Sequence, residues 1–127
     1  MTLGGRAMLA AALSDALPAW QIVADARALD SVRKPAAAVL WTSKRTRPDK
    51  LTLDILQDEI TLWVLTAADN PAIIENDLDE LLEAVIQAIE PLEWCAWTEA
   101  ERGTLDEKYP GWRLTVSCAY QLITEEP

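Results

Sequence analysis

The chain has 127 residues, of which 50 % are hydrophobic and 25 % are charged. This length supports one hydrophobic core, so we expect a single domain spanning residues 1–127. Acidic residues outnumber basic residues by 21 to 11, which gives a net charge of −10. Because duplex DNA repels so acidic a surface, the net charge disfavours a role in coating DNA, although an acidic wall suits a passage through which DNA slides.

The counts of histidine and cysteine exclude several kinds of catalytic and metal-binding site. Histidine is absent, which removes the commonest general base and every Ser-His or Cys-His nucleophile pair. The only cysteines, Cys95 and Cys118, are too few for a Cys-rich zinc site, and each lies in an apolar strand pattern. We interpret both as buried free thiols, and a disulfide bond between them is the alternative interpretation. No window reaches the roughly 20 apolar residues that a membrane span needs, so we expect no membrane partner.

The chain begins with one predicted helix and two predicted strands. Apolar residues recur at helical spacing over residues 5–17, and Pro18 ends the run. Residues 19–24 alternate between apolar and polar side chains, which indicates a short strand. Residues 36–43 are too apolar for an ordinary loop and predict a second strand.

Polar loops and a central strand follow. Residues 27–34 and 44–50 are polar and predict exposed loops. Residues 51–57 alternate, but their apolar positions also fit one face of a helical turn; we interpret them as a strand. The strongest strand prediction is 59–66, which is β-branched, aromatic and apolar on both faces like a central strand.

The second half predicts one long helix and two strands. Asn70 and Pro71 form a typical helix start, and apolar residues recur at 3.6-residue spacing until Pro91. The remaining predicted elements are a strand, a loop and a strand, at residues 92–102, 103–110 and 112–122. The element order predicts an α+β fold, a mostly antiparallel or mixed β-sheet of four to five strands with both helices packed on one face.

Nothing in the sequence indicates catalysis. There is no glycine-rich phosphate loop and no ligand spacing for a transition metal. The carboxylate pairs of the long helix fall on its polar face, where solvation explains them and a hard cation such as Mg²⁺ binds at most loosely. We therefore predict no enzymatic activity, no catalytic, metal or cofactor residues, and no cofactor beyond loosely bound Mg²⁺.

Charge is segregated along the chain. Residues 33–50 hold six of the eleven basic residues with Asp49 as their only acid, whereas residues 69–107 hold twelve acids and one base. A mildly repulsive, solvated helix face is the simplest explanation. The functional alternative is head-to-tail association, in which the basic segment of one copy meets the acidic helix of the next. Such a contact builds a closed ring or an open fibre.

The sequence has six tryptophans and no phenylalanine. Trp63, Trp94 and Trp97 fall in strand patterns and are predicted to lie in the core. Trp41 and Trp112 fall at predicted strand ends, where an exposed indole anchors a partner. The candidate interface residues are the basic segment, the helix acids and these last two tryptophans: Arg33, Lys34, Trp41, Lys44, Arg45, Arg47, Lys50, Glu75, Asp79, Glu83 and Trp112.

The order of elements and several phrases resemble the tail terminator (tail-completion) proteins of phages with long, non-contractile tails, of the lambda minor tail protein U type. The phrases are KPAAAVLWTSKRTRPDK, EITLWVLTA, NPAIIENDLDELLEAVIQAIEP and YPGWRLTVSCAYQLI. The resemblance covers nearly the whole chain and includes no catalytic fingerprint.

The resemblance implies a virion structural protein of the tail–neck region, assembled in the host cytoplasm. Members of this family form a homo-hexameric ring on the head-proximal end of the tail tube. The ring stops polymerisation of the major tail tube protein and docks the head-completion (stopper) protein, and DNA passes transiently through its lumen. The alternatives are another phage neck or head-closure adaptor, and a small protein-binding module unrelated to phages.

Overall fold

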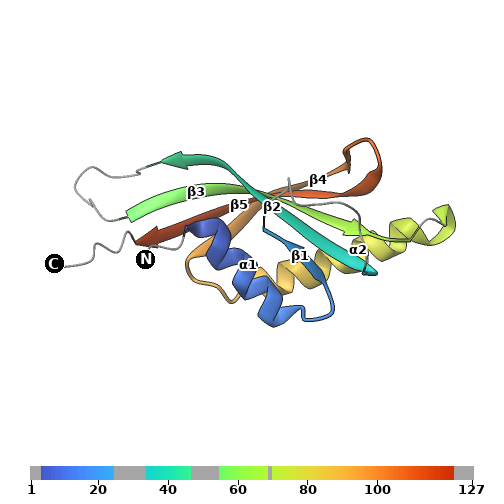
Figure 1. Ribbon diagram of the computed structural model, residues 1–127, viewed down its shortest axis with the longest axis horizontal. Coiled ribbons are helices and arrows are strands. Elements are labelled where there is room, and N and C mark those ends of the chain that lie inside the picture. Colours follow the sequence, from blue (N-terminus) through green and yellow to red (C-terminus); the bar gives the residue numbers. More distant parts are fainter. Residues whose placement is uncertain (1–3, 25–33, 47–54, 69, 122–127) are drawn as a thin grey trace.

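The computed structural model describes residues 4–24, 34–46, 55–68 and 70–121. The five strands form one sheet in the order β1-β2-β3-β5-β4, in which β1 and β2 are parallel and every other neighbouring pair is antiparallel (Figure 1). The elements in chain order are α1 (Gly5–Ala16), β1 (Gln21–Val23), β2 (Ala36–Thr46), β3 (Ile55–Thr66), α2 (Pro71–Ile89), β4 (Cys95–Leu105) and β5 (Tyr109–Gln121).

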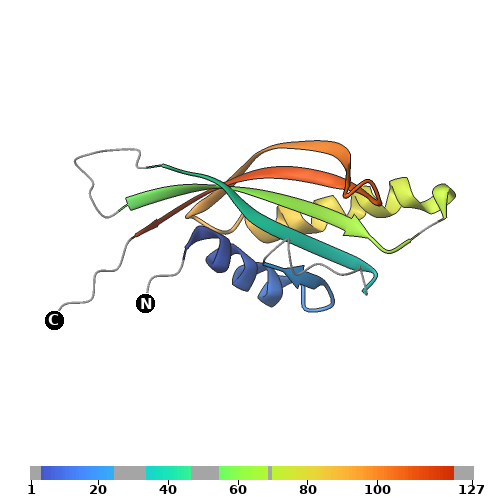
Figure 2. The ribbon, with the colours of Figure 1, turned by 45° about the horizontal axis from the view of Figure 1, so that its top comes forward.

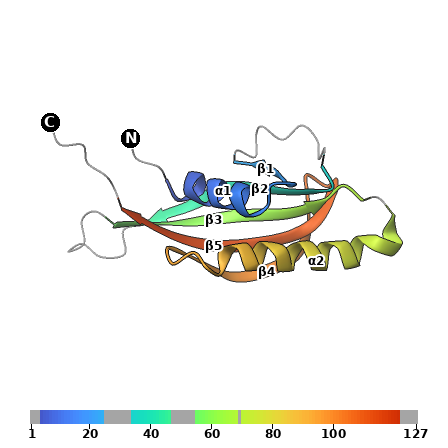
Figure 3. The same ribbon diagram turned by 90° about the horizontal axis from the view of Figure 1, so that it is seen from below.

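Both helices lie on the same face of the sheet, as Figure 2 shows. Seen from the helix side in Figure 3, α1 lies toward the β2 edge and α2 toward the β4 edge. The predicted α+β fold, a mixed sheet with two helices on one face, is therefore confirmed. We call the other face of the sheet the open face. Neither helix in the described ranges is both long and apolar enough to cross a membrane.

The main core fills the space between the helices and the sheet. In β3 the alternate residues Ile60, Leu62 and Val64 are fully buried there, together with Leu9 and Leu13 of α1. Burying an aliphatic side chain of this size contributes roughly 1.5–3 kcal/mol. The helix of 71–90 is confirmed, because the Asn70 side chain accepts the Ala72 N–H at 3.0 Å and α2 ends at Ile89.

A second, smaller cluster is buried on the open face. Val39 and Leu65 have no exposed surface, and Trp63 is 7 % exposed, as predicted for a core residue. Trp63 lies so close to β4 that a Cβ at Gly103 would be 2.9 Å from the indole. The other predicted core indoles, of Trp94 and Trp97, are half-buried beside the main core. Trp94 precedes β4 instead of lying within a strand.

The predicted loop at 44–50 is wrong for its first three residues. Lys44, Arg45 and Thr46 continue β2 and pair with residues 57–59 of β3. The strand interpretation of 51–57 is confirmed for residues 55–57, which begin β3. The remainder of that segment, and the predicted loop residues 27–33 and 47–50, lie outside the described residues.

The predicted loop at 103–110 is also wrong, because β4 and β5 form a tight hairpin there. Lys108 N–H donates to Leu105 O at 3.0 Å, which closes a turn between the strands. Its central residues, Asp106 and Glu107, have φ of 54° and 57°. Positive φ at both positions defines a type I′ turn, which strongly prefers Asn or Asp followed by Gly. The sequence Asp-Glu lacks that glycine signal.

We expect the substitution Glu107→Gly to stabilise the protein by about 0.5–1 kcal/mol, because glycine adopts positive φ without a steric cost. The measurement is the free energy of unfolding in urea. The control is Thr104→Gly, three residues away inside β4, which should destabilise the protein instead. Equal effects of the two substitutions would contradict the assigned turn.

Candidate functional site

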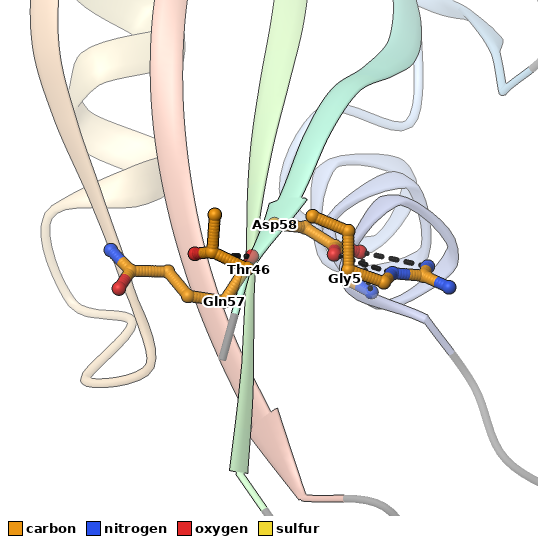
Figure 4. Close-up of polar contacts among 5 residues, drawn as sticks. Gly5, Thr46, Gln57 and Asp58 are labelled. Atoms are coloured by element: carbon orange, nitrogen blue, oxygen red, sulfur yellow. Dashed lines mark hydrogen bonds and ion pairs between the residues drawn. The ribbon is translucent and has the colours of Figure 1, made fainter. Parts of the chain in front are cut away.

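A buried carboxylate links two strands and a helix. The side chain of Asp58 in β3 has no exposed surface. It accepts hydrogen bonds from Arg45 Nε at 2.7 Å and Arg45 Nη2 at 3.1 Å, and from the Gly5 N–H at 3.3 Å (Figure 4). A buried charge is tolerated only when it is paired and hydrogen-bonded. These three bonds meet that condition.

A β-bulge in β2 places Arg45 beside Asp58. The pairing with β3 shifts register between Thr42 and Lys44, so that one extra residue interrupts the alternation of faces. Without the shift, Arg45 would point to the open face, as Trp41 does. With it, Lys44 lies opposite Glu59 and Arg45 lies opposite Asp58 on the helix face. Because of the bulge, Arg45 and not Lys44 forms the ion pair with the buried carboxylate of Asp58.

Asp58 also caps α1. The N-cap residue of this helix, Gly4, provides no side-chain cap, so the carboxylate of Asp58 takes that role from another strand. A negative charge there is favourable because the helix dipole places partial positive charge at the N-terminus. The approach is close: a Cβ at Gly5 would lie 2.9 Å from the Cβ of Cys118.

Arg45 is therefore bound within its own chain, although its side chain is 52 % exposed. Its guanidinium lies 5.6 Å from the centroid of the Tyr120 ring. The hydrogen bond to Asp58 raises the pKa of Arg45 above its usual value. Of the candidate interface residues, Arg45 has an internal role that the sequence analysis did not predict.

Two further candidates, Glu75 of α2 and Trp112 of β5, each contact Arg102. Arg102 of β4 donates two hydrogen bonds to Glu75 of α2, at 2.9 and 3.3 Å. The same guanidinium covers the Trp112 ring at 5.5 Å from its centroid. Trp112 lies within β5 and packs against the main core, so its predicted position at a strand end is wrong.

The other described candidates remain at the surface. Lys34 precedes β2 and is exposed, as are Lys44 in β2 and Asp79 and Glu83 on α2. Trp41 is half-buried within β2, on the open face, instead of at a strand end. The last three candidates lie outside the described residues: Arg33, Arg47 and Lys50.

The charged groups lie on opposite sides of the molecule. β2, with Lys44, lies at one side of the sheet, and α2, with Asp79 and Glu83, lies at the other, as Figure 3 shows for the two elements. Among the described residues, β1 pairs only with residues 37–39 of β2, and nothing pairs with the outer edge of β4. Within the described ranges, residues 40–46 of β2 and the outer side of β4 therefore have no neighbouring strand on one side.

The open face carries two adjoining shallow hollows, which sequence analysis did not single out. One, of about 440 Å³, has the apolar residues Trp41, Trp63 and Leu105 in its wall. The other, of about 300 Å³, is lined by polar side chains: Lys44, Thr46, Gln57, Glu59, Thr98, Thr115 and Ser117. The polar alternation of β5 is the sequence signal that could have indicated the second hollow.

Within the described ranges, no three histidine, cysteine or acidic side chains gather as metal ligands would. The site has instead opposite charges at two sides of the sheet and a shallow open face, and both are features of surfaces that contact another protein.

No protein-family model matches the chain, and a search of curated proteins finds no match.

We expect Asp58→Asn to destabilise the protein by about 1–3 kcal/mol. The amide of asparagine would place an N–H donor beside the guanidinium of Arg45 and the N–H of Gly5, which are themselves donors. The neighbouring substitution Glu59→Gln is the matched control: it removes the same charge from an exposed side chain on the opposite face and should leave stability nearly unchanged. Urea unfolding measures both. Similar stabilities of the two variants would contradict the role assigned to Asp58.

Proposed function

We propose that this protein is a ring-forming structural protein of a phage tail, a tail terminator that caps the head-proximal end of the tail tube. In this proposal the ring stops tube polymerisation and docks the head-completion protein, and DNA passes through its lumen. The resemblance of the sequence to that family motivates the proposal. The observation that carries it is the position of four exposed charges among the described residues: Lys34 and Lys44 lie near the two ends of β2, and Asp79 and Glu83 lie on α2.

Opposite charges on opposite sides favour a heterologous contact. When one surface of a copy complements a different surface of the next, the contact repeats and generates a ring if the rotation closes. An isologous dimer would instead bring each charged side against itself, where like charges repel. The unpaired outer edges of β2 and β4, as far as the described residues show, lie on the same two sides.

The internal bonds of the chain define which charges take part. Arg45 is bound to Asp58, and Glu75 is bound to Arg102. Of the candidate residues that the structure describes, those left without an internal ion pair are Lys34 and Lys44 on one side, and Asp79 and Glu83 of α2 on the other. We therefore assign the contact to these residues.

A second candidate function, a small protein-binding module, is favoured by the open face alone. The hollow walled by Trp41 and Leu105 is open to solvent, and an indole beside polar groups is a common anchor for a partner. Such a module acts as a monomer or a dimer. Its oligomeric state therefore distinguishes it from a tail terminator.

Light scattering and negative-stain imaging of the purified protein, alone and with preformed tail tubes, test the proposal. We expect a species of about 85 kDa, six times the 14.1 kDa of one chain, with a central hole. We expect this species to form free in solution or at the ends of tubes. A chain that stays monomeric under both conditions would contradict the proposed function and favour a binding module.

Charge reversal tests the assigned contact. A basic-side variant carries Lys34→Glu and Lys44→Glu, and an acidic-side variant carries Asp79→Lys and Glu83→Lys. We expect each variant alone to need at least roughly tenfold higher concentration for half-assembly, because like charges then face each other. A 1:1 mixture should assemble again, because each altered side of one variant now complements the altered side of the other. Sedimentation velocity measures all three samples.

The control for this experiment is Lys108→Glu, which reverses the charge of a lysine in the β4–β5 turn. The ammonium of Lys108 lies 5.1 Å from the centroid of the Tyr109 ring. It should assemble like the unaltered protein. Arg45 is left unchanged in every variant, since its loss would leave the buried carboxylate of Asp58 without its ion pair. Failure of the mixture to assemble, with both variants folded, would contradict a head-to-tail contact through these residues.

A further inference from the structure

The two cysteines lie directly opposite each other in the β4–β5 ladder. Ala119 N–H donates to Trp94 O at 2.8 Å, which is one of the two bonds that a hydrogen-bonded pair at these positions makes. The next pair, Cys95 and Cys118, is therefore a non-hydrogen-bonded pair, in which the Cα atoms approach to about 4.5 Å. That separation lies inside the range that a disulfide spans. Both side chains are free thiols in the structure.

The two thiols have unequal surroundings. Cys118 has no exposed surface and lies beneath Gly5, at the start of α1. Its hydrogen bond to Cys95, its burial and the nearby charge of Asp58 raise the pKa of Cys118, which keeps its proton. The hydrogen bond from Cys118 lowers the pKa of Cys95, against the effect of burial. Cys95 is therefore the more nucleophilic sulfur of the pair.

Cys95 is also the accessible member. It is 9 % exposed and lines a hollow of about 240 Å³ between the end of α2 and the start of β4. Trp97 and Glu90 form part of the wall, and the indole Nε1 donates to the carboxylate at 3.1 Å. The negative charge of Glu90 disfavours anionic reagents there and leaves access to small neutral ones.

We propose that Cys95 and Cys118 form an oxidisable dithiol site for a small neutral peroxide, with Cys95 as the attacking sulfur and Cys118 as the resolving sulfur. In the first step the Cys95 thiolate attacks one peroxide oxygen. A sulfur–oxygen bond forms, the oxygen–oxygen bond breaks, and the leaving hydroxide takes up the proton that Cys95 released, giving water.

In the second step the Cys118 sulfur attacks the sulfenic sulfur of Cys95. The disulfide bond forms, the sulfur–oxygen bond breaks, and the leaving hydroxide takes the Cys118 proton as water. Two thiols and one peroxide thus give one disulfide and two waters. The bond fastens the first residue of the edge strand β4 to β5. This inference is independent of the proposed function, because it concerns one folded chain.

The test is to treat the folded protein with hydrogen peroxide and then count thiols after unfolding. We expect both thiols to be lost, the mass of the monomer to fall by about 2 Da, and dithiothreitol to restore both thiols. Peptide mapping should locate the bond between Cys95 and Cys118. Two thiols that survive treatment in the folded state, or that react only to give cross-linked dimers, would overturn the proposal.

Single substitutions test the two roles. In Cys118→Ala, oxidation should stop at the Cys95 sulfenic acid, which dimedone traps. In Cys95→Ala, the remaining thiol should react at least roughly tenfold more slowly, because it is buried and protonated. Cys118→Val replaces the alanine variant if that variant does not fold, as judged by thermal unfolding. Equal rates for Cys95→Ala and the unaltered protein, or no dimedone adduct in a folded Cys118 variant, would overturn the assignment.

Discussion

The carboxylate of Asp58 has no exposed surface, and all three of its described hydrogen bonds come from the ends of other elements, Arg45 near the end of β2 and Gly5 at the start of α1. Because an unpaired charge at this depth is strongly unfavourable, the bonds must form together with the fold. They hold the last residues of β2 against β3 and place α1 over β5. The close approach of Gly5 to Cys118 follows from this arrangement.

This internal ion pair also determines the outer surface. The bulge before Lys44 turns Arg45 inward and leaves Lys44 on the open face, opposite Glu59. At the other side of the sheet, Arg102 neutralises Glu75, while Asp79 and Glu83 of α2 stay exposed. The proposed contact between copies thus uses only charges that have no role inside the chain. For this reason two exposed lysines, Lys34 and Lys44, remain on the β2 side of a chain whose net charge is −10.

Sequence reasoning predicted most of the fold and less of the candidate site. The order of elements, the cap at Asn70 and the inward alternation of β5 follow from local patterns that the fold does not override. The bulge in β2 has no local signal in the sequence. A register shift depends on which residue of β3, a separate strand, lies opposite Arg45. The sequence predicts a loop in place of the β4–β5 turn because Glu107 occupies a position where glycine is expected. The predicted position of Trp112 at a strand end is wrong for the same reason, because the tight turn lets β5 begin at Tyr109.

The central claim is that the β2 side of one copy meets the α2 side of the next. Zero-length carbodiimide coupling in an equal mixture of light and heavy-isotope protein tests it directly, because only adjoining amines and carboxylates become linked. The account predicts mixed-isotope peptides that join Lys34 or Lys44 to Asp79 or Glu83. Links between copies that instead join the hairpin ends to each other, or that never include either lysine in an assembled sample, would contradict it.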